Sequence, residues 1–456
     1  MTASRVPHFD VAVVGAGPVG AVAALAHARR GARVALFEAN PRSAQRLAGE
    51  WLHPPAIEVL RQIGIDLPAA IPEHSAGQGF VVFPDDGSLP CLLPYAGGAS
   101  GLSCEHSALV GTLRAAAAAH PNVEYFPSAR VRRIEGHSVR YVQRGAVGSI
   151  TAGRIVGADG RRSIVRASLG LPVDHAICSR MVGLLLRDVE LPFEGYGHVL
   201  LGGPGPILAY RISPHQVRLI LDVPVHRRGR QERAAYLWEG YAAVLPSALR
   251  PGFRAALLEG SFEGAANEIR ARSDYGREHV FLAGDAVGHH HPLTAVGITL
   301  GFGDALCLAE CRDPADYQSR RRQATRVAEL LAVGLYQALT ESSDEALATR
   351  QAIYRMWRKG SAERTRTMRY LACQDTRTAR FACSFFRAIA HALSTIVSEA
   401  LWRGELSHAG TVARALAGRL RWLLRGILPQ SGRRWALASE GHGKGTSVFA
   451  VAGDAG

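Results

Sequence analysis

Apolar positions near the start of the chain follow the order of a strand, a helix and a second strand. Short apolar runs cover residues 10–14 and 33–37, and an alanine-rich stretch connects them. Runs of this length are typical of buried strands, whereas the stretch between them has the length of a helix. The pattern predicts a βαβ unit over residues 10–38.

A different pattern covers residues 172–275, where apolar residues alternate with polar ones between turns. Clear examples are residues 181–186, 207–212 and 217–223. Alternation with a period of two predicts a mainly antiparallel sheet. Because polar residues are few, the region favours an apolar or aromatic ligand, although the core of a plain β-sandwich gives the same pattern.

Residues 280–304 combine a strand, a turn and the start of a helix. The apolar run 280–283 predicts a buried strand that Gly284 and Asp285 end, and residues 292–297 break the backbone before a helical pattern resumes. A helix N-terminus carries unpaired N–H groups and a positive partial charge. The junction therefore suits an anionic or electron-rich cofactor.

Helical patterns continue from about residue 315 to residue 428. Near their end, apolar side chains share one helix face and arginines share the opposite face: Val412, Leu416, Leu420, Leu423 and Ile427 against Arg414, Arg421 and Arg425. Such a basic amphipathic helix either packs its apolar stripe on the protein core or lies on a membrane surface. Residues 436–456 are rich in Gly, Ala and Ser, which predicts a disordered tail.

The turn after the first predicted strand reads GAGPVG, and an acid follows the second strand. Gly15 permits the sharp turn, Gly17 lets the backbone approach a pyrophosphate, and Gly20 lets the helix pack closely on the sheet. Glu38 can accept hydrogen bonds from ribose hydroxyls, and an acid there argues against a 2′-phosphate. The spacing predicts a dinucleotide site, with a ligand-free glycine turn as the alternative.

Three consecutive histidines, residues 289–291, form the one obvious titratable cluster near the 280–304 junction. Adjacent histidines seldom converge on one ion, so no metal site is expected. We interpret the run as loop polarity and helix capping rather than as a catalytic base. No catalytic residue is assigned from the sequence.

The composition of the chain indicates which broad classes of protein it can belong to. The chain has 456 residues with 47% apolar and 20% charged residues, which is typical of a globular protein. Seven cysteines without a CxxC pair argue against a disulfide framework and a zinc site. The absence of a signal-peptide pattern and of an uninterrupted apolar run of about 20 residues predicts a cytoplasmic protein, cytosolic or peripheral on the membrane.

The net charge of +14 comes mostly from residues 315–435, which contribute +12. Nearly all the basic residues are arginines, and the base composition of a genome explains such an excess as well as a ligand does. Nucleic-acid binding is therefore not inferred from the charge.

Four motifs in order give the chain a family resemblance. GAGPVG, RLAGE at residues 46–50, GADG at residues 157–160 and GDAVGHHHPLTAVGIT at residues 284–299 resemble the flavoprotein monooxygenases of the para-hydroxybenzoate hydroxylase fold. Within this group of enzymes the chain is most similar to squalene epoxidases, which have the same spacing from GDA through HPLT to the segment at Gly297-Ile298-Thr299. The resemblance covers about residues 8–310.

The chain also departs from these epoxidases. Phe80 stands where they usually have tyrosine, and Ala295 and Val296 stand where they often have consecutive glycines. These differences affect the expected choice of substrate and leave the expected flavin chemistry unchanged.

The resemblance implies an α/β fold with a Rossmann-like FAD-binding domain, an inserted mainly antiparallel β substrate domain and a C-terminal helical region. The implied segments are residues 1–171 and 276–314 for the FAD-binding domain, 172–275 for the substrate domain, 315–435 for the helices and 436–456 for the tail.

The resemblance also implies which residues contact FAD: Gly15, Gly17, Pro18, Val19, Gly20, Glu38, Ala39, Arg46, Arg114, Arg130, Asp159, Asp285, Gly297 and Ile298. Arg46 is equally explained as a solvated loop charge. The expected role of Asp285 is to bond the ribityl hydroxyls, and that of Gly297-Ile298-Thr299 is to present N–H groups to the flavin ring.

The implied reaction is the insertion of one oxygen atom from O2, as epoxidation or hydroxylation, through a flavin hydroperoxide. The implied substrate is a lipophilic isoprenoid, quinone-like or polyketide molecule, and electrons come from NAD(P)H directly or through a reductase partner. The basic C-terminal helices would provide a peripheral membrane contact. Two alternatives stay open, a flavin-dependent reductase of isoprenoid double bonds and a non-enzymatic flavoprotein that binds membrane surfaces.

Overall fold

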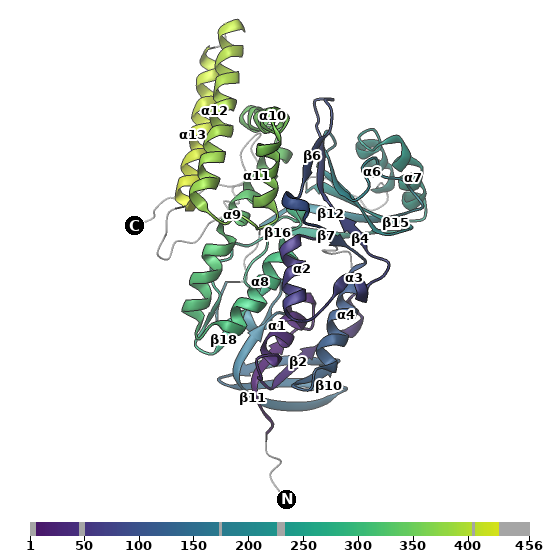
Figure 1. Ribbon diagram of the computed structural model, residues 1–456, viewed down its shortest axis with the longest axis vertical. Coiled ribbons are helices and arrows are strands. Elements are labelled where there is room, and N and C mark those ends of the chain that lie inside the picture. The colour runs from purple at the N-terminus through teal and green to yellow at the C-terminus, as the bar shows by residue number, and fades with distance from the viewer. Residues whose placement is uncertain (1–5, 45–50, 173–175, 226–232, 404–405, 428–456) are drawn as a thin grey trace, which may run out of the picture.

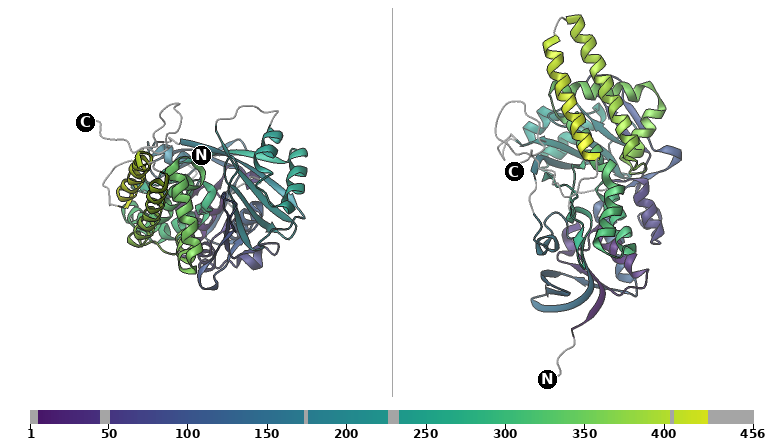
Figure 2. Two further views of the ribbon diagram at one scale, coloured as in Figure 1. Left: turned by 90° about the horizontal axis from the view of Figure 1, so that it is seen from above. Right: turned by 90° about the vertical axis from the view of Figure 1, so that its left-hand side faces the viewer.

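The computed structural model describes residues 6–44, 51–172, 176–225, 233–403 and 406–427 (Figure 1). Arg46 and the tail 436–456 lie outside these residues. The chain forms an eight-stranded sheet at one end, a seven-stranded sheet beside its middle and a helical region that projects beyond both (Figures 1 and 2).

The eight-stranded sheet contains the predicted βαβ unit. Its strands are β1 (His8–Val14), β2 (Val34–Glu38), β8 (Val123–Pro127), β9 (Ala129–Glu135), β10 (Ser138–Gln143), β11 (Ala146–Gly157), β17 (Gly276–Arg277) and β18 (Val280–Leu282). Along the order β17-β18-β11-β1-β2-β8 the neighbours from β18 to β8 are parallel, and β9 and β10 form an antiparallel extension on β11. Parallel strands bring their carboxyl ends to one edge of the sheet.

Helices cover the parallel part of this sheet. They are α1 (Pro18–Ala28), α4 (His106–Ala119) and α8 (Gly297–Glu310), and α1 packs against both of the others (Figure 1). The alanines of α1 and its glycine, Gly20, are buried, so short side chains allow the helix to approach its neighbours closely.

The seven-stranded sheet follows the alternating pattern of residues 172–275. Its order is β16 (Phe262–Ile269), β12 (Ala176–Arg187), β15 (Gln216–Pro224), β14 (Ile207–Ser213), β13 (Tyr196–Leu200), β5 (Gly79–Phe83) and β6 (Cys91–Pro94). All pairs are antiparallel except β13 with β5, which joins a hairpin from the first part of the chain. Two helices that the alternating pattern did not predict, α6 (Arg233–Tyr241) and α7 (Arg250–Leu258), pack on one face.

The C-terminal region consists of long helices, as predicted. They are α9 (Pro314–Thr340), α10 (Asp344–Lys359), α11 (Ser361–Leu371), α12 (Thr378–Arg403) and α13 (Leu406–Ile427). Side chains of α9, α10 and α11 meet the second face of the seven-stranded sheet in one apolar cluster, which we call the sheet–helix cluster; it includes Phe80, Met181, Tyr210, Leu335, Tyr336, Trp357 and Met368. The pair α12 and α13 extends away from the body of the molecule (Figures 1 and 2).

The apolar stripe of α13 is packed inside the protein. Val412, Leu416 and Leu423 are buried against α9, α10 and α12, whereas Arg414 and Arg421 are exposed. The side chains of Arg425 and Ile427 lie outside the described residues. Of the two interpretations of this stripe, packing on the protein's own core is therefore the one observed.

One helix is long and apolar enough to cross a membrane by length and composition, at residues Thr378–Trp402 in α12. The sequence predicted no such segment, because polar residues interrupt the apolar runs of α12. A single helix of this kind is weak evidence for a membrane span.

The remaining elements are short. They are η1 (Pro41–Ala44), β3 (Trp51–Leu52), α2 (Pro54–Gln62), α3 (Leu67–Ala70), β4 (Ser75–Gly77), η2 (Ala96–Gly98), β7 (Gly101–Ser103), α5 (Ile164–Ser168), η3 (Ser247–Leu249), η4 (Gly284–Ala286) and η5 (Pro292–Thr294). Strands β3, β7 and β4 form a separate three-stranded sheet.

Candidate functional site

Three loops meet at the carboxyl edge of the parallel sheet, after β1, β11 and β18. Gly15 has a φ of +98°, and a Cβ atom there would lie 2.6 Å from the carbonyl oxygen of Ala158. Its N–H donates to the carbonyl of Phe37 at 2.9 Å. Glycine is required here because the turn is left-handed and the loop after β11 lies against it.

The start of α1 leaves open space at one glycine and close contact at another. Gly17 caps the helix, and no described atom lies within 4 Å of the position that its Cβ would take. A Cβ at Gly20 would lie 1.8 Å from the carbonyl oxygen of Gly15. The loop is therefore tightly closed on one side and open at the helix N-terminus, as a bound pyrophosphate requires.

Glu38 is buried at the end of β2 and is held by the loop and by α4. Its carboxylate accepts hydrogen bonds from the N–H groups of Ala16 and Asn40 at 3.1 and 2.8 Å and from Arg114 at 2.8 Å. Arg114 also donates to the carbonyls of Ala16 and Pro41. Arg114 thus positions Glu38 and the glycine loop directly.

The start of α8 lies beside the start of α1. A Cβ at Gly301 would lie 2.4 Å from Cγ2 of Val19, and a Cβ at Gly284 would lie 3.1 Å from the same atom. Val19 therefore contacts both the turn after β18 and the first turns of α8. The N-termini of α1 and α8 and the turn that carries Asp285 are brought together at this point.

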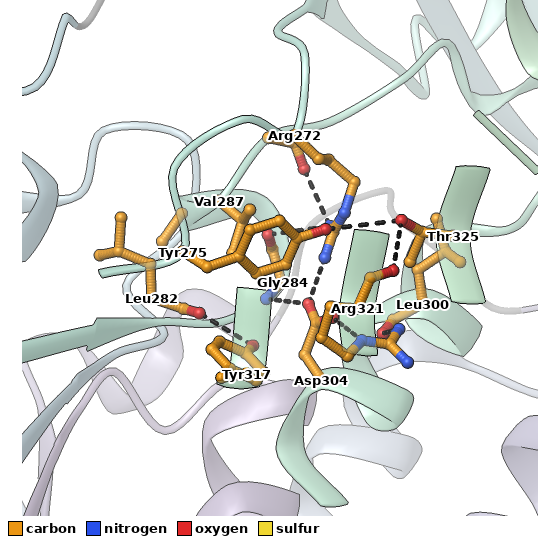
Figure 3. A network of polar contacts seen from close by, with 12 residues as sticks. Arg272, Tyr275, Leu282, Gly284, Val287, Leu300, Asp304, Tyr317, Arg321 and Thr325 are labelled. Carbon is orange, nitrogen blue, oxygen red and sulfur yellow. Dashed lines mark hydrogen bonds and ion pairs between the residues drawn. The ribbon is translucent and has the colours of Figure 1, made fainter. Parts of the chain in front are cut away.

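A buried ion-pair network holds the turn after β18 (Figure 3). Asp304 on α8 is fully buried and accepts hydrogen bonds from Arg272 at 2.5 Å, from Arg321 at 2.7 Å and from the N–H of Gly284 at 2.9 Å. Arg272 also donates to the carbonyls of Gly284 and Gly288. Asp304 and the two arginines that pair with it therefore fix both ends of the segment that contains Asp285.

The other residues predicted for the site differ in their exposure and in their hydrogen bonds. Asp285 is partly exposed and accepts from Arg161 at 3.4 Å, and Asp159 accepts from the N–H of Ile164 at 2.7 Å. Burial raises the pKa of Asp159, and its Oδ1 atom has no hydrogen-bond partner among the described residues. Arg130 on β9 is exposed.

Two further predicted residues are at least partly exposed. Ala39 follows β2 and is exposed, and Ile298 is half-buried in the first turn of α8.

These residues fit a flavin dinucleotide. Open space lies at the N-termini of both helices, since a Cβ at Gly17 or Gly297 would meet nothing within 4 Å in the described part of the chain. The hydroxyls of Thr294 and Thr299, on either side of Gly297, are buried without a partner among the described residues. Helix N-termini and buried unpaired hydroxyls are suitable partners for the phosphate and polar ring groups of such a cofactor.

The three histidines have different surroundings. His291 caps η5, since its Nδ1 accepts from the N–H of Leu293 at 3.2 Å, which confirms the predicted capping role. Its Nε2 therefore carries the proton and donates to Asp222 at 3.1 Å. Burial lowers the pKa of His289 to about 4 and also lowers that of His290. No cluster that could hold a metal ion occurs among the described residues.

The sequence did not indicate His53, which is fully buried beside η5. The indole N–H of Trp51 donates to the phenol oxygen of Tyr95 at 2.9 Å, and that hydroxyl lies 2.7 Å from Nδ1 of His53. Nε2 of His53 lies 3.0 Å from the carbonyl oxygen of Thr294. A chain of hydrogen bonds therefore reaches from β3 to the segment before α8.

Comparison with protein families gives two matches. A model of the squalene epoxidase family matches residues 151–408, which is more than half of the chain. A model of NAD(P)-binding Rossmann-like domains matches residues 13–50, which include the glycine loop and Glu38.

Curated relatives agree with the first match. Squalene epoxidase erg1 of Aspergillus fumigatus is 28% identical over 389 residues, which cover 77% of this chain and 80% of the relative. Squalene epoxidase 2, mitochondrial, of Arabidopsis thaliana is 30% identical over 363 residues, which cover 74% of this chain and 62% of the relative. Squalene monooxygenase of Rattus norvegicus is 26% identical over 389 residues, which cover 79% and 67%.

Solved structures share the fold at lower identity. PqsL, a probable FAD-dependent monooxygenase from Pseudomonas aeruginosa, has a TM-score of 0.61 and 22% identity, with 73% of this chain and 97% of that chain covered. The p-nitrophenol 4-monooxygenase PnpA from Pseudomonas putida has a TM-score of 0.68 and 20% identity, with 81% and 100% covered.

Proposed function

The chain belongs to the squalene epoxidase family of FAD-dependent monooxygenases, and we propose that it inserts one oxygen atom from O2 into a neutral, lipophilic isoprenoid. The observation that carries this proposal is the sheet–helix cluster. It is a large apolar cluster next to η5, and Leu293 of η5 belongs to it. An apolar wall beside the flavin-facing segment favours a substrate without charged groups.

In this proposal the flavin supplies the activated oxygen, and the chain's own residues hold and shield it. Gly15, Gly17 and Gly20 would receive the pyrophosphate, Glu38 the ribose, and Asp285 the ribityl chain. The N–H groups of residues 297–299 would face the flavin ring. The buried side chains around η5 would help to keep water from the substrate side of the flavin, which would protect a reactive oxygen species from side reactions.

Oxygen uptake by the purified protein tests the proposal. The expected result is a flavin absorption spectrum and NAD(P)H oxidation with O2 uptake that rises when squalene or a shorter polyprene is added. A protein that cannot be reconstituted with FAD would contradict the assignment of the site. A yellow protein that reduces the polyprene double bond without consuming O2 would instead support a flavin-dependent reductase of isoprenoids.

The source of electrons is a separate part of the proposal. No second glycine-rich nucleotide loop is evident in the described part of the chain, so NAD(P)H either reaches the flavin directly or acts through a reductase partner. Turnover by the purified enzyme with NADPH alone would support the direct route. Turnover that needs an added flavoprotein reductase would support the partner.

A membrane contact completes the proposal, because α12 exposes large apolar side chains near its end. Leu401 and Trp402 are 67% and 93% exposed, and α12 extends away from the body of the molecule (Figure 2). Exposed tryptophan and leucine at the end of a projecting helix suit the interface of a bilayer. We expect sedimentation with phosphatidylcholine vesicles, weakened by the pair Leu401→Ser and Trp402→Ser. Equal sedimentation of both proteins would contradict the contact.

A further inference from the structure

A cavity of about 90 Å³ lies among four C-terminal helices, and none of its lining residues belongs to the glycine loop or to α8. Its walls include Leu331 and Leu335 of α9, Ile353 of α10, Tyr370 of α11 and Phe385 of α12. A cavity of this volume accommodates a short stretch of hydrocarbon rather than a whole polyprene.

The polar side chains that line the cavity are already paired within the protein. The indole N–H of Trp357 donates to Thr367 at 3.0 Å, and Thr367 donates to the carbonyl of Glu363 at 3.0 Å. The hydroxyls of Tyr370 and Ser384 lie 3.4 Å apart. A ligand therefore finds no unsatisfied group among them, which favours an apolar ligand.

The charges at the cavity are balanced as well. Glu363 accepts from Arg366 at 2.7 Å on its own helix and pairs with Arg387 of α12 at 2.9 Å. Glu363 and Arg366 are the charged residues that line the cavity, and they pair with each other, whereas Arg387 does not line it. This balance disfavours an anionic acyl lipid and favours a chain with a neutral end.

The cavity connects two parts of the proposed pathway of a lipophilic substrate. Leu335 and Trp357 line it and also belong to the sheet–helix cluster, and Leu331 and Ile353 pack against that cluster. Part of its wall comes from α12, whose exposed apolar end is the proposed membrane contact. The cavity thus lies between the surface where such a molecule would arrive and the wall where it would react.

We propose that this cavity binds one end of a neutral prenyl chain, as a site separate from the position of oxygen insertion. The inference rests on the proposed function for the substrate class. The occupant is held by apolar contacts with α9 to α12, and no bond of the chain changes there.

Gly334 provides a way to fill the cavity without disturbing its walls. It lines the cavity on α9, and a Cβ there would meet only Phe385 Cε2, at 3.8 Å. The leucine of Gly334→Leu would extend into the cavity, and a helical glycine that is replaced by leucine gains helix propensity. Gly410→Leu on α13 is the matched control, because its Cβ would meet no described atom within 4 Å.

Isothermal titration calorimetry with farnesol, a neutral prenyl alcohol, measures the site directly in the full-length protein. We expect wild type and Gly410→Leu to bind one equivalent of farnesol more than Gly334→Leu. At this site farnesol should bind roughly tenfold more tightly than dodecanoate, a difference of about 1.4 kcal/mol. Equal stoichiometry in the three proteins, or tighter binding of dodecanoate, would overturn the proposal.

The same titration separates this proposal from the assignment of the flavin site. It needs no turnover and gives the same difference in stoichiometry whether or not FAD is bound. With the active holoenzyme, Gly334→Leu should also raise KM for a polyprene and leave kcat unchanged. A lower kcat at unchanged KM would show that the cavity acts on the chemical step, and would contradict a separate binding site.

Discussion

The tautomer of His53 follows from its two neighbours. The carbonyl of Thr294 can only accept, so Nε2 of His53 donates to it and Nδ1 accepts from the hydroxyl of Tyr95. Complete burial lowers the pKa of His53 to about 4, which keeps the ring neutral. The hydrogen bonds from Trp51 through Tyr95 and His53 to Thr294 therefore all run in one direction, and aligned bonds of this kind strengthen one another.

Tyr95→Phe should break this chain at its centre. The change leaves the indole N–H of Trp51 and Nδ1 of His53 buried without partners, which should lower the free energy of unfolding by about 3 kcal/mol. Urea denaturation measures the loss. Tyr125→Phe, at a half-buried phenol on β8, is the matched control and should change stability by less than about 0.5 kcal/mol. Similar values for both variants would show that the chain contributes little.

Ala295 adopts a left-handed conformation directly before α8, with a φ of +52°. An L-residue is strained there by roughly 1 to 2 kcal/mol, whereas glycine is not, although glycine gains freedom in the unfolded chain. We expect Ala295→Gly to stabilise the protein by up to about 1 kcal/mol, measured by urea denaturation. The same exchange at Ala305, inside α8, should destabilise it; loss of stability at both positions would contradict the strain.

The sequence predicted the local geometry of those candidate site residues that belong to motifs. The spacing of Gly15, Gly17 and Gly20 before a helix already requires the turn that the structure contains. The sequence did not predict roles for His53 and Arg272. His53 contacts a residue that is distant in sequence, and Arg272 lies outside any recognised motif. The contact of His53 with Thr294 joins residues that are 241 positions apart.

Among the helices, α1 and α8 pack against each other at a glycine of α8, Gly301. Gly301 lies against Val19, and a larger side chain on α8 would push the two helix N-termini apart. Gly301→Val should therefore lower the free energy of unfolding by about 2 kcal/mol through overpacking. It should also weaken retention of FAD, measured as release of flavin fluorescence on dilution.

Gly410→Ala provides the control for this crossing. It is a helical glycine with open space around its Cβ position, so the exchange should be neutral or stabilising by up to about 1 kcal/mol. A destabilised Gly301→Val that retains FAD normally would mean that the helix crossing supports the fold but does not position the cofactor.

The elements that the sequence predicted are those with a clear local period. The strands around residues 10–38 and 207–223 and the long C-terminal helices appear where apolar spacing indicated them. Helices α6 and α7 were missed because nine residues hold few turns, too few for a helical period to stand out from alternation. The parallel pairing of β13 with β5 joins distant segments, which no local pattern reports.

For the whole molecule, part of the arginine excess is structural. Arg350 of α10 pairs with Asp85 in the turn between β5 and β6 at 2.6 Å, and Arg419 of α13 pairs with Glu341 after α9 at 2.7 Å. Both pairs are largely buried and connect the C-terminal helices to other segments. The positive charge of residues 315–435 therefore does not by itself indicate an anionic partner.

The whole fold should also be sensitive to mild acid, because several histidines are buried in neutral form. Burial lowers the pKa to about 4 in His27, His53, His198 and His289. The ordinary pKa of about 6.5 applies in the unfolded chain. Between these two values the unfolded chain binds more protons than the folded one, so stability is fully present above pH 6.5 and is lost as the pH falls toward 4.

Each of these rings should contribute a loss on the order of 2 kcal/mol at pH 5, so the midpoint of urea denaturation should fall steeply between pH 7 and pH 5. His53→Gln removes one titrating group and should make the fall shallower even though it lowers stability at pH 7. A denaturation midpoint that stays constant from pH 7 to pH 5 would mean that these rings accept protons without leaving the folded core.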